Sequence, residues 1–204
     1  MGKFAPGTDV ESGMDRAVRV LLVSGSLRGR STNTAALRST AVAVLPGLDA
    51  VLYEGMGGLP HFNPDDDREP LPGAVADLRS RIRAADAVVF STPEYAGALP
   101  GSFKNLLDWT IGDDQPGSIY QKPVAWFNVN AHGAVNAHES LRKVLGYATA
   151  GIIENACAEV TVTHPMVGDD GLIADEQVRG QLASLLENLA AHVRGIGDET
   201  SRRP

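Results

Sequence analysis

The chain has 204 residues, a length that corresponds to one domain rather than two. It carries 18 basic and 25 acidic residues, and this formal net charge of −7 argues against broad binding to nucleic acid, because phosphates require a basic surface. The single cysteine, Cys157, excludes a disulfide framework and a multi-cysteine zinc site. The sequence has neither a run of about 18 apolar residues, as in a transmembrane helix, nor the apolar stretch of a signal peptide. We therefore expect a cytoplasmic protein without a membrane partner.

Two terminal segments, residues 1–17 and 196–204, lack apolar periodicity, and we expect flexible segments on either side of one domain over 18–195. Within that domain, short apolar runs alternate with longer segments rich in Ala, Leu and Val. The short runs predict five strands, at Val18–Val23, Ala50–Tyr53, Asp86–Thr92, Pro123–Val129 and Ala158–Thr163. The longer segments predict five helices, at Thr32–Leu45, Gly73–Ala84, Leu99–Trp109, Val135–Ala148 and Asp175–Val193. The segment Glu54–Pro72 contains four prolines and predicts a loop.

The alternation of strands and helices predicts the fold class. Repeated strand–helix–strand units have parallel strands and right-handed crossovers, which gives an α/β three-layer sandwich with a five-stranded parallel sheet and helices on both faces. The near-continuous apolar strands are typical of a sheet covered on both faces. Ligands of such sheets bind beyond the carboxyl ends of the strands. The loops after the first, third and fourth predicted strands are therefore the candidate binding segments.

The loop after the first strand, Gly25–Asn33, has the composition of an anion site. Its small residues let backbone N–H groups approach a phosphate, and the helix that follows adds partial positive charge. Arg28 or Arg30 supplies charge-assisted hydrogen bonds. The loop matches neither GxGxxG nor a GxxxxGK[ST] P-loop, which favours a single phosphate monoester. The alternative is that Ser31 or Thr32 only caps the helix.

Two further loops follow the third and fourth strands. The segment Thr92–Gly101 holds two prolines and two glycines, which indicates a rigid loop in which Tyr95 can lie beside a flat ring. The alternative is a plain strand-to-helix turn. The segment Asn128–Ala134 is polar and follows the fourth strand, and we expect this segment, including Asn130, to border the same cleft.

The sequence context of the other reactive side chains favours structural roles for them. Ser26 does not lie in a GxSxG elbow, so a hydrolase triad is disfavoured. His132 and His138 have no carboxylate or cysteine between them at ligand spacing, so we expect no metal site. Cys157 has no basic neighbour in sequence and is interpreted as a small core residue. The acidic triplet Asp65–Asp67 lacks the spacing of a calcium loop and is interpreted as a solvated turn.

Two motifs resemble one known family. Gly25–Asn33 (GSLRGRSTN) is similar to the opening motif of the NADPH-dependent FMN reductases, usually G-S-x-R-x-x-S-x-N. Pro93–Trp109 (PEYAGALPGSFKNLLDW) is similar to their second motif, P-E-Y-N-x-x-x-P-G-x-L-K-N-x-x-D-W. The resemblance covers roughly Val18 to Val193.

The resemblance implies a flavodoxin-like fold with strand order 2-1-3-4-5, bound FMN, and NADPH or NADH as the electron donor. It implies a homodimer or homotetramer. The positions that match its phosphate-binding residues are Ser26, Arg28, Ser31 and Asn33, with Thr32 as a backbone donor. The positions that match its isoalloxazine loop are Pro93, Glu94, Tyr95 and Gly97. Ala96 stands where the family often has Asn, so only its backbone can serve there. Lys104, Asn105, Asp108 and Trp109 match a helix motif interpreted as packing and subunit contact.

The implied function is hydride transfer from NAD(P)H through FMN to a flavin, quinone, azo or nitro compound, or chromate, in a ping-pong order. Because the cofactor carries the chemistry, we predict no dedicated acid–base residue. The segment Gly58–Pro72 is expected to be a mobile loop that lines the substrate pocket. Two other functions stay open. One is a flavodoxin-type electron carrier, which the charge of −7 would suit. The other is a phosphate- or nucleotide-sensing module without redox activity.

Overall fold

The computed structural model describes residues 16–201; the rest of the predicted flexible ends, 1–15 and 202–204, lies outside the described residues. Its strands are β1 Val18–Ser24, β2 Leu48–Tyr53, β3 Ala87–Ser91, β4 Pro123–Asn130, β5 Gly151–Ile152 and β6 Ala158–Val162. Its α-helices are α1 Thr32–Ala41, α2 Gly73–Ala84, α3 Gly101–Ile111, α4 Val135–Tyr147 and α5 Glu176–Ser201. Residues 16–201 contain no helix with the length and hydrophobicity of a membrane span.

The parallel sheet has the order β2-β1-β3-β4-β5, which confirms the flavodoxin-like arrangement. One edge differs from the five-stranded prediction. The predicted fifth strand is β6, which pairs with the second half of β4 in the register Phe127↔Ala158. The first half of β4 pairs instead with β5, at Pro123↔Gly151 and Val124↔Ile152. A strand of two residues is too short to produce an apolar periodicity, so the sequence pattern did not reveal it.

Helix boundaries depart from the prediction where local chemistry intervenes. Helix α1 ends at Ala41 instead of Leu45, and Leu45 directly precedes Pro46, which disfavours helical backbone in the residue before it. Helix α3 begins at Gly101, with Pro100 as its N-terminal boundary residue. Helix α5 continues to Ser201, beyond the predicted end at Val193 and into the segment expected to be flexible.

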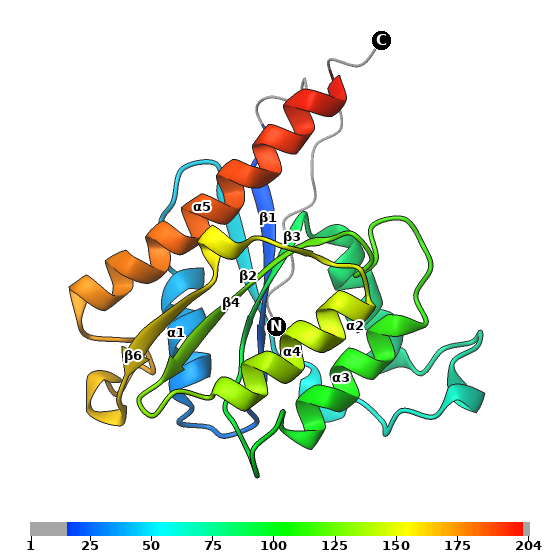
Figure 1. Cartoon of the computed structure of the whole chain (residues 1–204), viewed down its shortest axis with the longest axis horizontal. Coiled ribbons are helices and arrows are strands. Elements are labelled where there is room, and N and C mark those ends of the chain that lie inside the picture. The colour runs from blue at the N-terminus through cyan, green and yellow to red at the C-terminus, as the bar shows by residue number, and fades with distance from the viewer. Residues whose placement is uncertain (1–15, 202–204) are drawn as a thin grey trace.

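Helices cover both faces of the sheet. Helices α1 and α5 pack on one face, and α2, α3 and α4 pack on the other (Figure 1). Along β4, the side chains of Ala125, Phe127 and Val129 join the core under α1 and α5, whereas those of Val124 and Trp126 join the opposite core. This alternation is the two-residue period of a strand.

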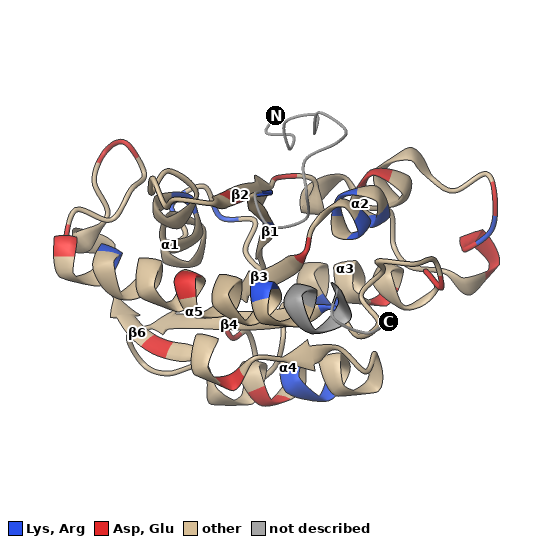
Figure 2. Cartoon of the chain, turned by 90° about the horizontal axis from the view of Figure 1, so that it is seen from above, with Lys and Arg blue, Asp and Glu red and all other residues tan. Residues whose placement is uncertain are grey.

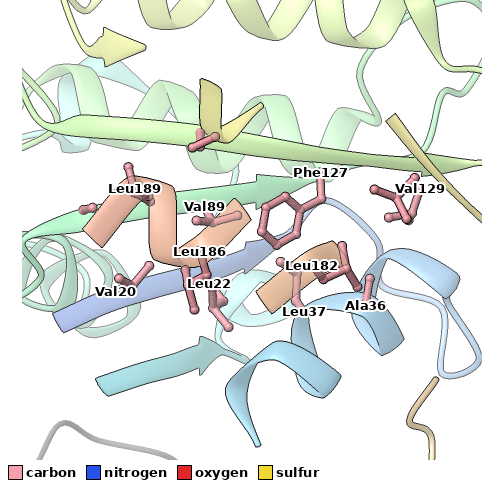
Figure 3. Packing of buried hydrophobic residues seen from close by; sticks show 14 of the residues in the cluster. Val20, Leu22, Ala36, Leu37, Val89, Phe127, Val129, Leu182, Leu186 and Leu189 are labelled. Carbon is pink, nitrogen blue, oxygen red and sulfur yellow. The ribbon is translucent and has the colours of Figure 1, made fainter. Parts of the chain in front are cut away.

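Phe127 lies near the centre of the first core. Figure 3 shows its ring among side chains of β3, α1 and α5, including Val89, Leu37, Leu182 and Leu186. The α5 leucines at positions 182, 186 and 189 recur at helical spacing and are fully buried, so the sheet-facing stripe of α5 is apolar. The two cores fix the β1, β3 and β4 ends from which the polar loops emerge.

Candidate cofactor-binding site

A cavity of about 710 Å³ lies at the carboxyl ends of β1, β3, β4 and β6. This volume is within the range of small-molecule and cofactor sites. Nine residues predicted from the sequence line it: Ser26, Arg28, Ser31, Thr32, Asn33, Pro93, Glu94, Tyr95 and Asn130. The fold therefore brings together segments about 60 and 100 residues apart in sequence. The predicted residues Ala96 and Gly97 are not among its lining residues.

One end of the cavity is the start of α1. Ser31 caps this helix by accepting a hydrogen bond from the backbone N–H of Thr34 at 3.3 Å, and it also lines the cavity. The first turn of α1 has no acidic residue, so the partial positive charge of the helix N-terminus is not neutralised there. Arg28 adds an exposed guanidinium. Ser31 therefore caps α1, as the alternative interpretation of this loop expected, and its place in the cavity lining is compatible with the predicted anion site.

Asn33 is anchored beneath this end. Its side chain is 2% exposed, and its Oδ1 accepts a hydrogen bond from Ser91 Oγ of β3 at 2.9 Å. Ser91 Oγ also lies 2.7 Å from the carbonyl oxygen of Phe127 on β4. Asn33 therefore ties the start of α1 to the two central strands, a structural role that its motif position did not indicate.

Gly25 allows the first and second loops to meet. Its N–H donates to the carbonyl of Ser91 at 2.8 Å. A Cβ at this position would lie 2.7 Å from Thr92 Cβ and 2.9 Å from Phe103 Cδ1, both on buried side chains. Such distances are shorter than real Cβ contacts, so only glycine fits without displacement.

The second loop is a two-residue hairpin. Tyr95 and Ala98 exchange backbone hydrogen bonds of 3.0 and 3.1 Å around Ala96 and Gly97. Both turn residues have positive φ, 51° and 73°, which is the backbone of a type I′ turn. Tyr95 is 45% exposed at the base of this turn and lines the cavity. Ala96 and Gly97 shape the turn that holds it.

Asn130 and Glu94 connect the loops after β3 and β4. Asn130 Nδ2 donates to the Thr92 carbonyl at 3.1 Å. The Glu94 carboxylate accepts hydrogen bonds from Asn136 Nδ2 and from the backbone N–H of Ala137, each at 3.1 Å. These hydrogen bonds lower the pKa of the Glu94 carboxyl below its ordinary value, and the bond from the Asn136 side chain has the largest effect. Glu94 therefore carries a negative charge at the positive end of α4.

Sequence reasoning missed part of the cavity. Residues 162–165, at the end of β6, and residues 135 and 136 also line it, whereas Ala131–Ala134 belong to the segment that was expected to border the cleft. The first group follows the predicted fifth strand, so the rule that ligands bind beyond the carboxyl ends of strands would have included it. Asn136 had no motif signal, because its partner Glu94 is 42 residues away in sequence.

The segment Gly58–Pro72, which was expected to line the substrate pocket, contributes no residue to the lining of this cavity. The loop extends past α2 and α3, where Figure 2 shows its acidic stretch in red. Asn105 Nδ2 and Trp109 Nε1 both donate to the Pro60 carbonyl at 2.9 Å, and Phe62 N–H donates to Asn105 Oδ1 at 2.7 Å. These bonds give Asn105 and Trp109 of the second motif a structural role within the chain.

An ion pair holds the far end of the same loop. Asp67 lies 2.7 Å from the guanidinium of Arg79 on α2, and both side chains are largely buried. Arg79 also donates from Nε to the Trp109 carbonyl at 2.9 Å. Asp67 of the acidic triplet is therefore paired, whereas Asp65 and Asp66 are exposed as expected for a solvated turn.

Cys157 and His138 lie outside the cavity lining. Cys157 is half-buried between the two cores, and burial raises the pKa of its thiol to about 11, which supports its interpretation as a small core residue. His138 is buried beside Trp126, and burial lowers the pKa of its imidazole. Its Nδ1 lies 2.8 Å from the Ala134 carbonyl oxygen. Within residues 16–201, no group of three or more His, Cys, Asp or Glu side chains is arranged to hold a metal ion.

Comparison with known proteins identifies the family. The family described as NADPH-dependent FMN reductase matches residues 18–163, more than half of the chain. The chain belongs to this family. It is 33% identical over 186 residues to the NAD(P)H-dependent FMN reductase of Pseudomonas aeruginosa, covering 90% of this chain and 99% of that protein. Membership makes the chain an oxidoreductase of the FMN reductase and quinone reductase type.

Other relatives agree with this assignment. A quinone reductase of Pseudomonas putida is 28% identical over 183 residues, covering 89% of this chain and 97% of that protein. The solved structure of FerB, a flavoenzyme NAD(P)H:(acceptor) oxidoreductase from Paracoccus denitrificans, matches with a TM-score of 0.71 and 27% identity. That match covers 88% of this chain and 98% of the FerB chain. The family and the flavodoxin-like fold predicted from the two motifs are thus confirmed.

Proposed function

We propose that this protein binds FMN and catalyses hydride transfer from NADPH or NADH to a small acceptor, such as a flavin, a quinone, an azo or nitro compound, or chromate. The observation that carries this proposal is the cavity at the strand ends, where two separate family motifs and Asn130 meet. Nearly full-length similarity to an FMN reductase and a quinone reductase supports the reaction class.

The phosphate of FMN would lie at the start of α1. Ser26, Ser31 and Thr32 offer hydroxyl groups there, and the helix N-terminus contributes partial positive charge. Arg28 would contribute a charge-assisted hydrogen bond. Asn33, anchored on Ser91, would keep this end of the helix in register with β3.

The flavin ring would lie against the second and third loops. Pro93 and Tyr95 provide apolar and aromatic surface, and the type I′ turn at Ala96 and Gly97 keeps Tyr95 at the cavity. Asn130 holds the third loop against the second through the Thr92 carbonyl. The residues that fit FMN are thus cationic and hydroxyl-bearing at the phosphate end, whereas Pro93 and Tyr95 lie beside the polar groups of Glu94 and Asn130 at the other end.

FMN, when bound, supplies the acceptor and donor of the hydride, so the chain needs no acid–base residue of its own. The side chains around the cavity orient the reacting rings at close distance. In a ping-pong order, the nicotinamide would leave before the electron acceptor enters the same cavity. The cavity of about 710 Å³ opens to solvent beside the exposed Tyr95, which provides a route for this exchange.

Steady-state kinetics test this function. The purified protein with FMN should oxidise NADPH rapidly when a quinone is present, and varying both substrates should give parallel double-reciprocal lines. A flavin that stays oxidised under anaerobic NADPH would contradict the enzyme. A protein that binds FMN but oxidises NADPH only through an added reductase would instead be an electron carrier, the function that a net charge of −7 would suit.

A matched pair of variants tests the phosphate end. Arg28→Ala together with Ser31→Ala should weaken FMN binding by about 2–4 kcal/mol, taking roughly 1–2 kcal/mol for each phosphate contact. Arg30→Ala is the control, because it removes a positive charge from the same loop but Arg30 does not line the cavity. Unchanged FMN affinity in the double variant, or an equal loss in Arg30→Ala, would show that the phosphate lies elsewhere.

We also propose a cytoplasmic homodimer or homotetramer, on the basis of the family resemblance. Tyr95, Val135 and Tyr147 are 45%, 57% and 80% exposed and are apolar side chains that a subunit interface could cover. Light scattering coupled to gel filtration tests the assembly: a mass of about 21.5 kDa would be that of a monomer and would contradict the proposal.

A further inference from the structure

The short loop between β4 and α4 forms one wall of the cavity. Residues 131–134 connect Asn130, the last residue of β4, to Val135, the first residue of α4, and every residue from 130 to 136 lines the cavity. Much of this wall is exposed to solvent, including Ala131, His132, Val135 and Asn136. The wall is held to the rest of the protein at its two ends by hydrogen bonds. What holds its two ends therefore sets the shape of the cavity.

Both ends of this wall are fastened to one short segment, Thr92–Glu94. At the first end, Asn130 Nδ2 donates to the Thr92 carbonyl at 3.1 Å. At the second end, the Glu94 carboxylate accepts from Asn136 Nδ2 and from the Ala137 N–H, both at 3.1 Å. The first attachment uses backbone oxygen, whereas the second depends entirely on the Glu94 side chain.

Helix α4 has no capping side chain of its own. Its N-terminal boundary residue is Ala134, which makes no side-chain capping bond. The first turn of a helix has backbone N–H groups without intrahelical partners, and a negative charge close to them is stabilising. Glu94 provides both an acceptor and the charge from another loop. The hydrogen bonds also lower the pKa of its carboxyl, which keeps it ionised.

We infer that Glu94 is a positioning residue, whose carboxylate caps α4 from the neighbouring loop and thereby holds the 130–136 wall of the cavity in place for the flavin. This inference rests on the proposed function. It assigns the Glu94 side chain to the protein and not to the cofactor, although Glu94 belongs to the motif that the family resemblance associates with the flavin ring. The ring contact at this position then falls to Pro93, Tyr95 and the backbone.

Three variants separate this role from a general loss of structure. Glu94→Ala removes both hydrogen bonds of the carboxylate. Glu94→Gln keeps a carbonyl oxygen that can accept from Ala137 N–H, so it should restore part of the effect. Glu139→Ala is the matched control, because Glu139 lies two residues beyond Ala137 on α4 and its side chain is exposed outside the cavity lining.

Hydrogen–deuterium exchange of the flavin-free protein tests the attachment directly. Glu94→Ala should increase exchange in a peptide covering 131–138 by about tenfold, without a matching increase in β1 or α5, whereas Glu94→Gln should recover to within about threefold of the wild type. Exchange in Glu139→Ala should equal that of the wild type. Unchanged exchange in Glu94→Ala, or an equal increase in Glu139→Ala, would overturn the inference.

Titration with FMN then tests the consequence for the site. Glu94→Ala should bind FMN about tenfold more weakly than the wild type, and Glu94→Gln should regain most of that loss. Wild-type FMN affinity in a Glu94→Ala protein with a loosened wall would overturn the positioning role while leaving the proposed function intact. A wild-type protein that binds no FMN would overturn the proposed function, and the exchange data would still decide whether Glu94 holds the wall.

Discussion

Gly25→Ala is a sharp test of how closely the first two loops of the site approach each other. The added Cβ would lie 2.7 Å from Thr92 Cβ and 2.9 Å from Phe103 Cδ1. Thr92 and Phe103 are both 0% exposed, so neither can swing aside into solvent. Overpacking of this kind costs typically about 1–3 kcal/mol. We expect the free energy of unfolding to fall by about 2 kcal/mol, which for a chain of this length lowers the melting temperature by about 4–8 °C.

Gly29→Ala is the control for this substitution. Gly29 lies four residues further along the same loop, and a Cβ there would meet no atom within 4 Å. Denaturant unfolding of the two flavin-free variants measures the difference. Gly29→Ala should be neutral or more stable by up to about 1 kcal/mol, because alanine restricts the unfolded chain. Equal stabilities of Gly25→Ala and Gly29→Ala would refute the argument that steric contact, and not loop flexibility, requires glycine at position 25.

Three further predictions concern the hairpin, the long loop and the thiol. Ala96→Asn should stabilise the protein by about 0.5–1 kcal/mol in thermal unfolding, because asparagine tolerates the positive φ of 51° better than alanine. A lower stability of this variant would contradict the idea that Ala96 has a strained backbone. Asn105→Ala should lower the free energy of unfolding by about 2 kcal/mol and speed proteolysis within residues 58–72, because two hydrogen bonds to that loop are lost. An unchanged rate of cleavage would contradict the view that Asn105 holds the loop in place. Cys157 should react with iodoacetamide at pH 8 about 100-fold more slowly than a free thiol, because its pKa of about 11 lowers the thiolate fraction. Equal reaction rates in the folded and the unfolded protein would contradict this prediction.

The fold was predictable because its signals are local and periodic. The apolar runs at β1, β3 and β4 are long enough to identify buried strands, and alternation with helices then determines a parallel sheet. The edge was less predictable. Strand β5 has two residues, and the turn Glu154–Ala156 separates it from β6, so no period develops there. The end of α5 was missed because the pattern beyond Val193 lacks regular apolar positions.

The residues that line the cavity were predictable where a single loop contains several of them. The hydroxyl, amide and arginine side chains before α1 indicate an anion site by composition alone. Contacts between loops could not be predicted in this way. The bonds from Asn136 to Glu94 and from Asn105 to Pro60 join residues more than 40 positions apart, and only the packed sheet and helices bring them together. The same limitation explains why the contacts of Gly58–Pro72 with α3 were not predicted.

Calorimetric titration with FMN and with riboflavin tests the central claim most directly, because the two ligands differ only in the phosphate. The wild-type protein should bind FMN at least about tenfold more tightly than riboflavin, as expected for a charge-assisted phosphate contact. That preference should disappear when Arg28 and Ser31 are both replaced by alanine. Equal affinity of the wild-type protein for the two ligands, or heat from neither, would contradict an FMN site at the start of α1.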